Sequence, residues 1–257
     1  MSEKNEVPTL IPPLEGLARL RQFTAARIGL GRAGIGLPTA AHLRFAADHA
    51  RAKDAVYSSL DTKPLAGGLK RLGLKVGFVR SAARDRDEYL RRPDLGRRLD
   101  EEASLANLPP SDVVLVVADG LSAAAVDANL LPLADVLVPQ LRARGIEIET
   151  AVFVEQGRVA AGDPIGQALK ARLVILLIGE RPGLSSADSM GCYMTFAPKP
   201  GTPDSRRNCI SNIRLGGLLP RLAADQIAWL AAEALRREVS GTSLKADPTR
   251  AIEGKSG

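Results

Sequence analysis

The sequence is poor in cysteine and in aromatic residues, and it has no long apolar run. Its 257 residues include only Cys192 and Cys209, too few for a disulfide framework or a zinc site with four cysteine ligands. Aromatic residues make up 4% of the chain, which argues against a module that stacks nucleic-acid bases on aromatic rings. No apolar run exceeds six residues, whereas a membrane-spanning helix needs about 20.

The chain also shows no secretory signal, because it opens with the polar residues MSEKN. We therefore expect a cytoplasmic protein. Hydrophobic residues make up 45% of the sequence, which suits one or two globular domains.

The formal net charge of +6 allows two interpretations. One is a nucleic-acid-binding protein; the other is an arginine-rich protein whose charges are mixed along its solvated helices. Residues 80–103 interleave both signs, and no patch of a single sign stands out, so we favour the second interpretation.

The predicted fold class is α/β, with a helical N-terminal domain followed by a Rossmann-like, mainly parallel α/β domain. Apolar residues at helical spacing predict helices over 39–56, 92–107, 123–144, 165–171 and 221–241. Continuous or alternating apolar runs predict strands over 113–120, 149–154, 173–179 and 191–196. Residues 58–80 are glycine-rich and fit neither class. The domains are thus a loose arm (1–16), a helical domain (17–108), the α/β domain (109–241) and a polar tail (242–257).

Two motifs have weak support as functional sites. The run from Gly29 to Gly34 matches G-x-G-x-x-G, but neither the buried strand that a dinucleotide fingerprint needs before it nor the helix needed directly after it is predicted. His42 and His49 lie seven residues apart on one predicted helix, without a nucleophile or metal-ligand pattern. We predict a glycine-rich turn and two structural or interface histidines.

Residues 179–212 carry the densest set of polar groups. They begin where a predicted buried strand ends, which is the edge of a parallel sheet where ligands bind. Ser185, Ser186, Asp188 and Ser189 offer hydrogen-bonding groups, and RRNCISN adds more around Cys209. These groups suit a polar ligand, and they also suit an ordinary surface loop.

The segment LIGERPGLSSADSMGCYMTFAPKPGTPDSRRNCISNIRLGGL resembles the small (light) subunit of ethanolamine ammonia-lyase. Further similar segments are residues 24–56, 89–99, 113–126 and 157–166, so that the resemblance extends from about residue 20 to residue 241. It implies a subunit of an enzyme that converts ethanolamine to acetaldehyde and ammonia by adenosylcobalamin radical chemistry.

The resemblance also implies a cofactor site and a partner. The family's cobalamin contacts fall on Val159, Glu180 and Cys209, and no catalytic residue or metal site is expected in this chain. The implied partner is a large TIM-barrel subunit in a multimer of heterodimers, with neither nucleic acid nor membrane involved. Some relatives have a longer N-terminal leader that is linked to packing in a microcompartment. In this chain the resemblance begins by about residue 20, so we expect it in the cytoplasm instead. The competing hypotheses are a stand-alone nucleotide-binding or regulatory protein and a basic nucleic-acid binder.

Overall fold

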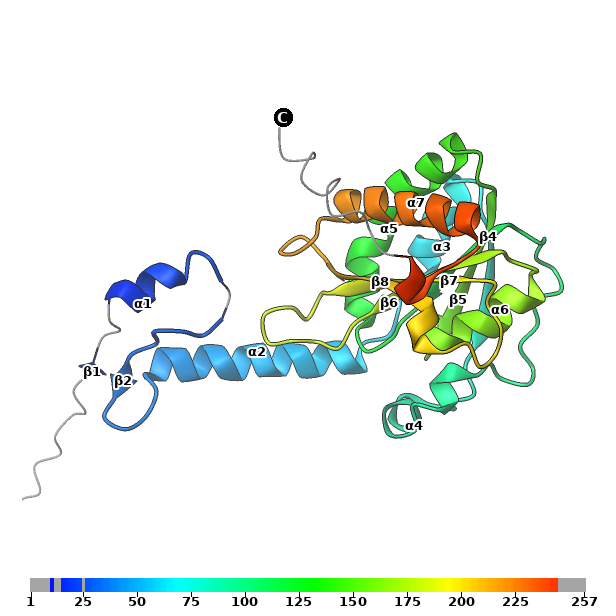
Figure 1. Ribbon diagram of the computed structural model, residues 1–257. Coiled ribbons are helices and arrows are strands. Elements are labelled where there is room, and N and C mark those ends of the chain that lie inside the picture. Colours follow the sequence, from blue (N-terminus) through cyan, green and yellow to red (C-terminus); the bar gives the residue numbers. More distant parts are fainter. Residues whose placement is uncertain (1–9, 12–14, 25, 245–257) are drawn as a thin grey trace, which may run out of the picture.

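A mixed six-stranded sheet forms the centre of the computed structural model, which describes residues 10–11, 15–24 and 26–244. The strand order is β3-β5-β4-β6-β7-β8 (Figure 1). The first four positions run parallel, and β7 is antiparallel to both of its neighbours. The bounds are β3 Lys75–Arg80, β4 Val113–Ala118, β5 Ile148–Glu155, β6 Leu173–Gly179, β7 Met190–Phe196 and β8 Arg207–Ile213. The α/β fold class is confirmed.

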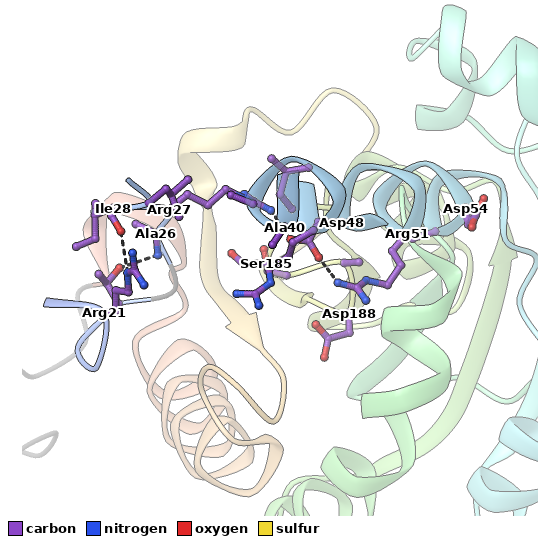
Figure 2. A pocket seen from close by; sticks show the side chains of 18 of the residues that line it. Arg21, Ala26, Arg27, Ile28, Ala40, Asp48, Arg51, Asp54, Ser185 and Asp188 are labelled. Carbon is purple, nitrogen blue, oxygen red and sulfur yellow. Dashed lines mark hydrogen bonds and ion pairs between the residues drawn. The ribbon is translucent and has the colours of Figure 1, made fainter. Parts of the chain in front are cut away.

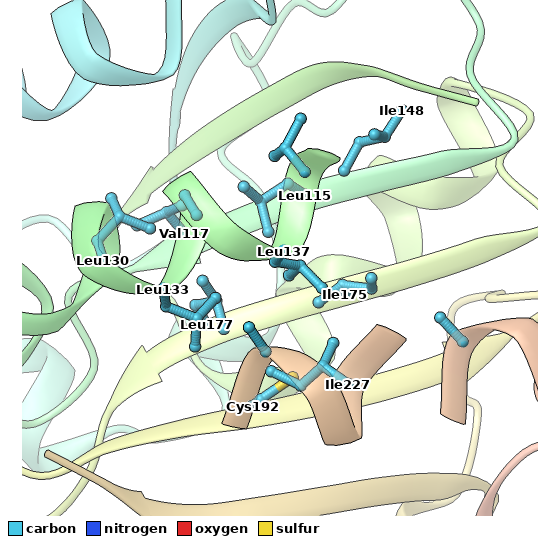
Figure 3. Close-up of a cluster of buried hydrophobic side chains, with 14 of the residues drawn as sticks. Leu115, Val117, Leu130, Leu133, Leu137, Ile148, Ile175, Leu177, Cys192 and Ile227 are labelled. Carbon is cyan, nitrogen blue, oxygen red and sulfur yellow. The ribbon is translucent and has the colours of Figure 1, made fainter. Parts of the chain in front are cut away.

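Helices cover both faces of this sheet. One face packs against α3 (Thr62–Arg71), α5 (Ala123–Ala143) and α7 (Pro220–Arg237), and Figure 3 shows the leucine-rich core between them. The other face packs against α6 (Gly162–Ala168) and the 3-10 turn before it. Every residue of β4 is buried, as its run of β-branched residues predicts.

The central helix α5 is long and apolar enough to cross a membrane by length and composition alone. The short apolar runs had predicted no such helix. Polar residues interrupt the apolar runs of α5, but its mean hydropathy remains high enough for a membrane span. In the structure α5 packs between the sheet and α7, with ten of its residues buried. The helix begins where Ser122 Oγ accepts a hydrogen bond from Ala125 N at 3.2 Å.

The N-terminal part projects away from the sheet on a single helix. Helix α2 (Thr39–Tyr57) is confirmed, but Ala55 is its only buried residue. The short elements α1 (Glu15–Leu20), β1 (Leu10–Ile11) and β2 (Arg32–Ala33) lie at its far end (Figure 1). This part therefore has little core of its own among the described residues.

Three differences from the predicted elements concern the sheet and its boundary. The strands β3 and β8 were not predicted, and β3 carries the sheet across the domain boundary placed near residue 108. The helix over 92–107 is wrong: only Leu95–Arg97 forms a 3-10 turn. Arg98 and Leu99 instead pair with residues 81 and 82, and Leu99, Ala103 and Leu105 pack against the sheet. A purely helical N-terminal domain is thus not confirmed.

The remaining helix predictions need smaller adjustments. Helix α6 begins at Gly162 and ends at Ala168, earlier than predicted. Helix α7 ends at Arg237, because Glu238 adopts a left-handed conformation with φ of 55°. Helix α4 (Arg86–Arg91) follows β3. Most of the predicted loose arm and of the predicted polar tail, residues 1–9, 12–14 and 245–257, lie outside the described residues.

Candidate functional site

The carboxyl ends of β4 and β6 form the topological switch point of the sheet. From β4 the chain returns through α5 to β5 on one side, and from β5 it crosses through α6 to β6 on the other. Ligands of open α/β sheets bind at such a point, just beyond the strand ends. Glu180 is the first residue after β6, so the fold places it at this position.

The Glu180 carboxylate is held by three hydrogen bonds. Ser189 Oγ donates to Oε2 at 2.6 Å, Ser211 Oγ donates to Oε1 at 2.6 Å, and the Asn212 backbone N–H donates to Oε2 at 3.2 Å. These donors come from the start of β7 and the end of β8. The structure thus joins residues that are more than 30 positions apart around one partly buried carboxylate.

The loops after β4 and β6 are in direct contact. Gly120 has a φ of 58°, and a Cβ atom there would lie 2.2 Å from the carbonyl oxygen of Gly179. Leu121 N also donates to this oxygen at 2.9 Å. The two loops therefore close the gap between the ends of β4 and β6.

The other two predicted residues lie on the same face of the sheet. Val159 opens the 3-10 turn after β5 and packs, partly buried, in the cluster that also contains Tyr193. Tyr193 pairs directly with Cys209 on β8. Cys209 is exposed, and two residues further along the same strand Ser211 reaches Glu180. The structure therefore gathers Val159, Glu180 and Cys209 along one side of the sheet.

The two cysteines differ in their surroundings. Cys192 is fully buried in the core, and this burial raises the pKa of its thiol. Partial desolvation also raises the pKa of the Cys209 thiol, although a hydrogen bond with Tyr193 opposes the shift. Both cysteines therefore carry a protonated thiol at neutral pH, and Cys209 is the accessible one.

The hydroxyl-rich loop after Glu180 forms one wall of a large cavity. This cavity, of about 990 Å³, lies between α2 and residues 184–188, and Ser185 and Asp188 line it (Figure 2). On the α2 side Asp48 forms ion pairs with Arg27 and Arg51. The binding segment predicted from the sequence thus faces the N-terminal part as well as the sheet edge.

Sequence reasoning missed a second polar cluster at the same edge. Asp119, the first residue after β4, accepts hydrogen bonds from Gly157 N at 3.1 Å and Gly120 N at 2.9 Å. Burial raises its pKa to about 6, although Arg86, 3.4 Å away, opposes the shift. Its position directly after the apolar run 113–118 was the available signal.

Neither weak motif has the local structure that its functional interpretation requires. Gly29, Gly31 and Gly34 all have positive φ, and the two-residue strand β2 lies inside the motif. Among the described residues before it, the last element is helix α1 and not a buried strand. His42 and His49 are exposed on α2, and the ring of His49 stacks on that of Phe45 with their centroids 6.4 Å apart. Within the described residues, no three His, Cys, Asp or Glu side chains are grouped to hold a metal ion.

Fold and site together define an α/β protein with a hydrogen-bonded carboxylate at the switch point of its sheet. Residues 14–245 match the family model of the ethanolamine ammonia-lyase light chain (EutC). The chain is 52% identical over 234 residues to the ethanolamine ammonia-lyase small subunit of Azotobacter vinelandii, covering 88% of this chain and 87% of the relative. It is 51% identical over 240 residues to that of Rhodopseudomonas palustris, covering 92% of each. The chain belongs to the family of ethanolamine ammonia-lyase small subunits, and is thus a subunit of a lyase.

Proposed function

We propose that this chain binds adenosylcobalamin through Val159, Glu180 and Cys209 and covers it at the interface with a large TIM-barrel subunit. The assembly, a multimer of such pairs, would convert ethanolamine to acetaldehyde and ammonia. The observation that carries the proposal is the position of Glu180. It lies at the switch point of the sheet, held by Ser189 and Ser211, and Cys209 lies on the same strand as Ser211.

The Glu180 carboxylate suits the amide-bearing rim of a corrin ring. Its two oxygens offer about four acceptor positions, and the protein fills three of them. One position is left for an amide N–H from a ligand. The serine and backbone donors fix the carboxylate, so that this acceptor is already oriented before the ligand arrives.

Val159 and Cys209 suit the apolar parts of the same ligand. Val159 is partly buried, and Cys209 beside Tyr193 presents a neutral thiol on an exposed strand. A neutral thiol behaves as a small hydrophobic group. The surface thus combines one oriented acceptor with apolar contacts, as large polar cofactors require.

In this proposal the cofactor, and not a side chain of this chain, carries out the bond-breaking chemistry. When bound, adenosylcobalamin supplies the radical chemistry, and the protein supplies binding and orientation. This chain has no D-x-H-x-x-G segment: Asp48-His49 is followed by Ala-Arg and lies on α2. It therefore offers no such histidine to replace the lower base of the cobalamin.

The projecting N-terminal part supports the proposal of a large partner. Exposed large apolar side chains gather on it: Leu17, Leu20, Phe23, Ile35, Leu37, Leu43 and Phe45. Ile35 is fully exposed, and Phe23 is 79% exposed. Apolar side chains concentrated in this way mark interaction surfaces, so we assign this arm to contact with the large subunit.

Replacing Glu180 should weaken cobalamin binding. Glu180→Gln keeps the shape of the side chain but removes its charge, so we expect about a tenfold rise in the apparent Kd for the assembled enzyme, as for the loss of a charge-assisted hydrogen bond. The maximal rate at saturating cofactor should fall less. Glu149→Gln changes an exposed carboxylate at the opposite edge of the sheet and serves as the matched control. Equal affinity of the Glu180 variant and the wild type would contradict the assignment.

Cobalamin should protect Cys209 from alkylation. In the cofactor-free complex we expect a thiol reagent to label Cys209, because this residue is exposed on β8. Bound cobalamin should block the reaction. Cys192 is buried and should stay unlabelled in both states, which makes it the internal control in a mass-spectrometric assay. Equal labelling of Cys209 with and without cobalamin would remove it from the proposed site.

A further inference from the structure

The function proposed above uses none of residues 89–99, one of the segments that are similar to the family. This segment begins in α4 and continues through the 3-10 turn Leu95–Arg97. That turn contacts a second 3-10 turn, Val159–Ala161, which starts at the proposed cobalamin contact Val159. The segment is therefore a neighbour of the cofactor surface, although none of its residues belongs to the proposed site.

Tyr89 holds the backbone of Gly157 from one side. The tyrosine is completely buried, and its hydroxyl donates to the carbonyl oxygen of Gly157 at 3.2 Å. Burial raises the pKa of this hydroxyl, so that it stays a hydrogen-bond donor at neutral pH. From the other side, the N–H of Gly157 donates to Asp119 Oδ1 at 3.1 Å. The peptide groups before and after the Gly157 Cα atom are therefore both fixed.

The same tyrosine holds Arg158, the next residue. The guanidinium carbon of Arg158 lies 4.2 Å from the centroid of the Tyr89 ring, within the distance of a cation–π interaction. Its Nη2 donates to the backbone carbonyl oxygen of Tyr89 at 3.4 Å. The backbone N–H of Arg158 donates to the carbonyl oxygen of Gly96 at 2.7 Å. Arg158 is thus anchored through its side chain and through its backbone.

Gly96 permits this close packing. A Cβ atom on Gly96 would lie 2.8 Å from Arg158 Cγ and 2.9 Å from Tyr89 Cε2. The buried Tyr89 ring has little room to move away, because protein interiors are closely packed. A larger residue at position 96 therefore has to displace Arg158 and the turn that follows it.

Val159 depends on these anchors because it is only partly buried and directly follows Arg158. Dispersion contacts weaken steeply with distance: a gap of roughly 0.5–1 Å forfeits a quarter to a half of the contact energy. We propose that Tyr89 and Gly96 are positioning residues, which hold Val159 at contact distance from the cobalamin. The inference rests on the proposed function and adds to it two residues that act through another.

The affinity for adenosylcobalamin of the complex with the large subunit tests the proposal. Val159→Ala removes two methyl groups from the contact, so we expect the Kd to rise about tenfold. Gly96→Ala displaces the contact without removing it, and the loss of half of the contact energy corresponds to about a threefold rise. Gly67→Ala is the matched control and should leave the Kd unchanged, because the nearest atom to the new Cβ would be 3.9 Å away.

Two substitutions of Tyr89 provide a second test that does not introduce a clash. Tyr89→Leu removes the stacked ring and the hydroxyl, and should also raise the Kd about threefold. Tyr89→Phe keeps the ring and should stay within about twofold of the wild type. The maximal rate at saturating adenosylcobalamin should change little in each variant. A purely structural role would instead lower the amount of folded enzyme, and hence the maximal rate, without changing the Kd of the folded fraction.

A double-mutant cycle shows whether Gly96 acts through Val159. In the Val159→Ala background Gly96→Ala should leave the Kd nearly unchanged, because the methyl groups that it displaces are gone. An equal effect in both backgrounds, or unchanged affinity of both Gly96→Ala and Tyr89→Leu, would overturn the inference and leave the proposed function intact. Unchanged affinity of Val159→Ala would overturn both, because it contradicts the proposed contact itself.

Discussion

The purified chain alone should form no acetaldehyde from ethanolamine and adenosylcobalamin, and adding the large subunit should produce activity. The reason lies in the described side chains. Glu180 is occupied by three hydrogen bonds, Cys209 is a protonated thiol, and both histidines are exposed on α2. No acid, base and nucleophile converge among them. Coupling acetaldehyde formation to oxidation of a nicotinamide cofactor by alcohol dehydrogenase measures the rate.

The same assay can test the projecting arm. Leu43 is 61% exposed on α2, so Leu43→Glu should leave the fold intact while weakening association with the large subunit. Lys199→Glu places the same charge on an exposed loop of the α/β part and should associate as the wild type does.

Acetaldehyde production by the chain without any large subunit would refute the assignment of catalysis to the partner.

The elements that could be predicted are those whose pattern reflects burial on both faces. The strands β4 and β6 are continuous apolar runs and were predicted nearly to the residue. The strand β3 was missed because the edge of the sheet leaves most of it partly exposed and because it contains Gly77. A Cβ atom on Gly77 would lie 2.5 Å from Leu108 Cδ1, so the glycine allows close packing within the strand. Local sequence carries no sign of that distant contact.

The candidate site likewise has one part that the sequence predicts and another that only the structure shows. Glu180 was placed at a ligand edge because a buried run stops immediately before it. Its grouping with Ser189 and Ser211 depends on the antiparallel pairing of β7 and β8, and only the structure shows that pairing. Asp119 was missed because its cluster joins three separate segments, which contain Arg86, Gly120 and Gly157.

The strand β8 was missed because its sequence, RNCISNI, begins with a charge that ordinarily excludes burial. The side chain of Arg207 is nevertheless only 3% exposed. Its two terminal nitrogens each donate to one oxygen of Asp163 at 2.7 Å, and Thr195 Oγ1 and the Thr202 carbonyl accept further bonds. This network fixes β8 against the first turn of α6.

Removing Asp163 should therefore destabilise the protein strongly. Asp163→Ala removes the buried counter-charge of the Arg207 guanidinium and leaves it only the exposed Asp204, 3.2 Å from its Nε. We therefore expect the free energy of unfolding to fall by about 3–5 kcal/mol. Urea denaturation followed by circular dichroism measures the change. Replacing both partners by leucine should recover much of the loss, because an apolar pair carries no desolvation penalty.

The surface pair between Glu233 and Arg236 on α7 provides the comparison. Arg236 is exposed there, so Glu233→Ala should change the stability little. A small loss for Asp163→Ala, equal to that of Glu233→Ala, would show that the buried pair is dispensable. Because β8 carries Cys209 and Ser211, Asp163→Ala should also increase the alkylation of Cys209 in the cobalamin-bound complex. The pair thus links the stability of an edge strand to the surface on which we place the cofactor.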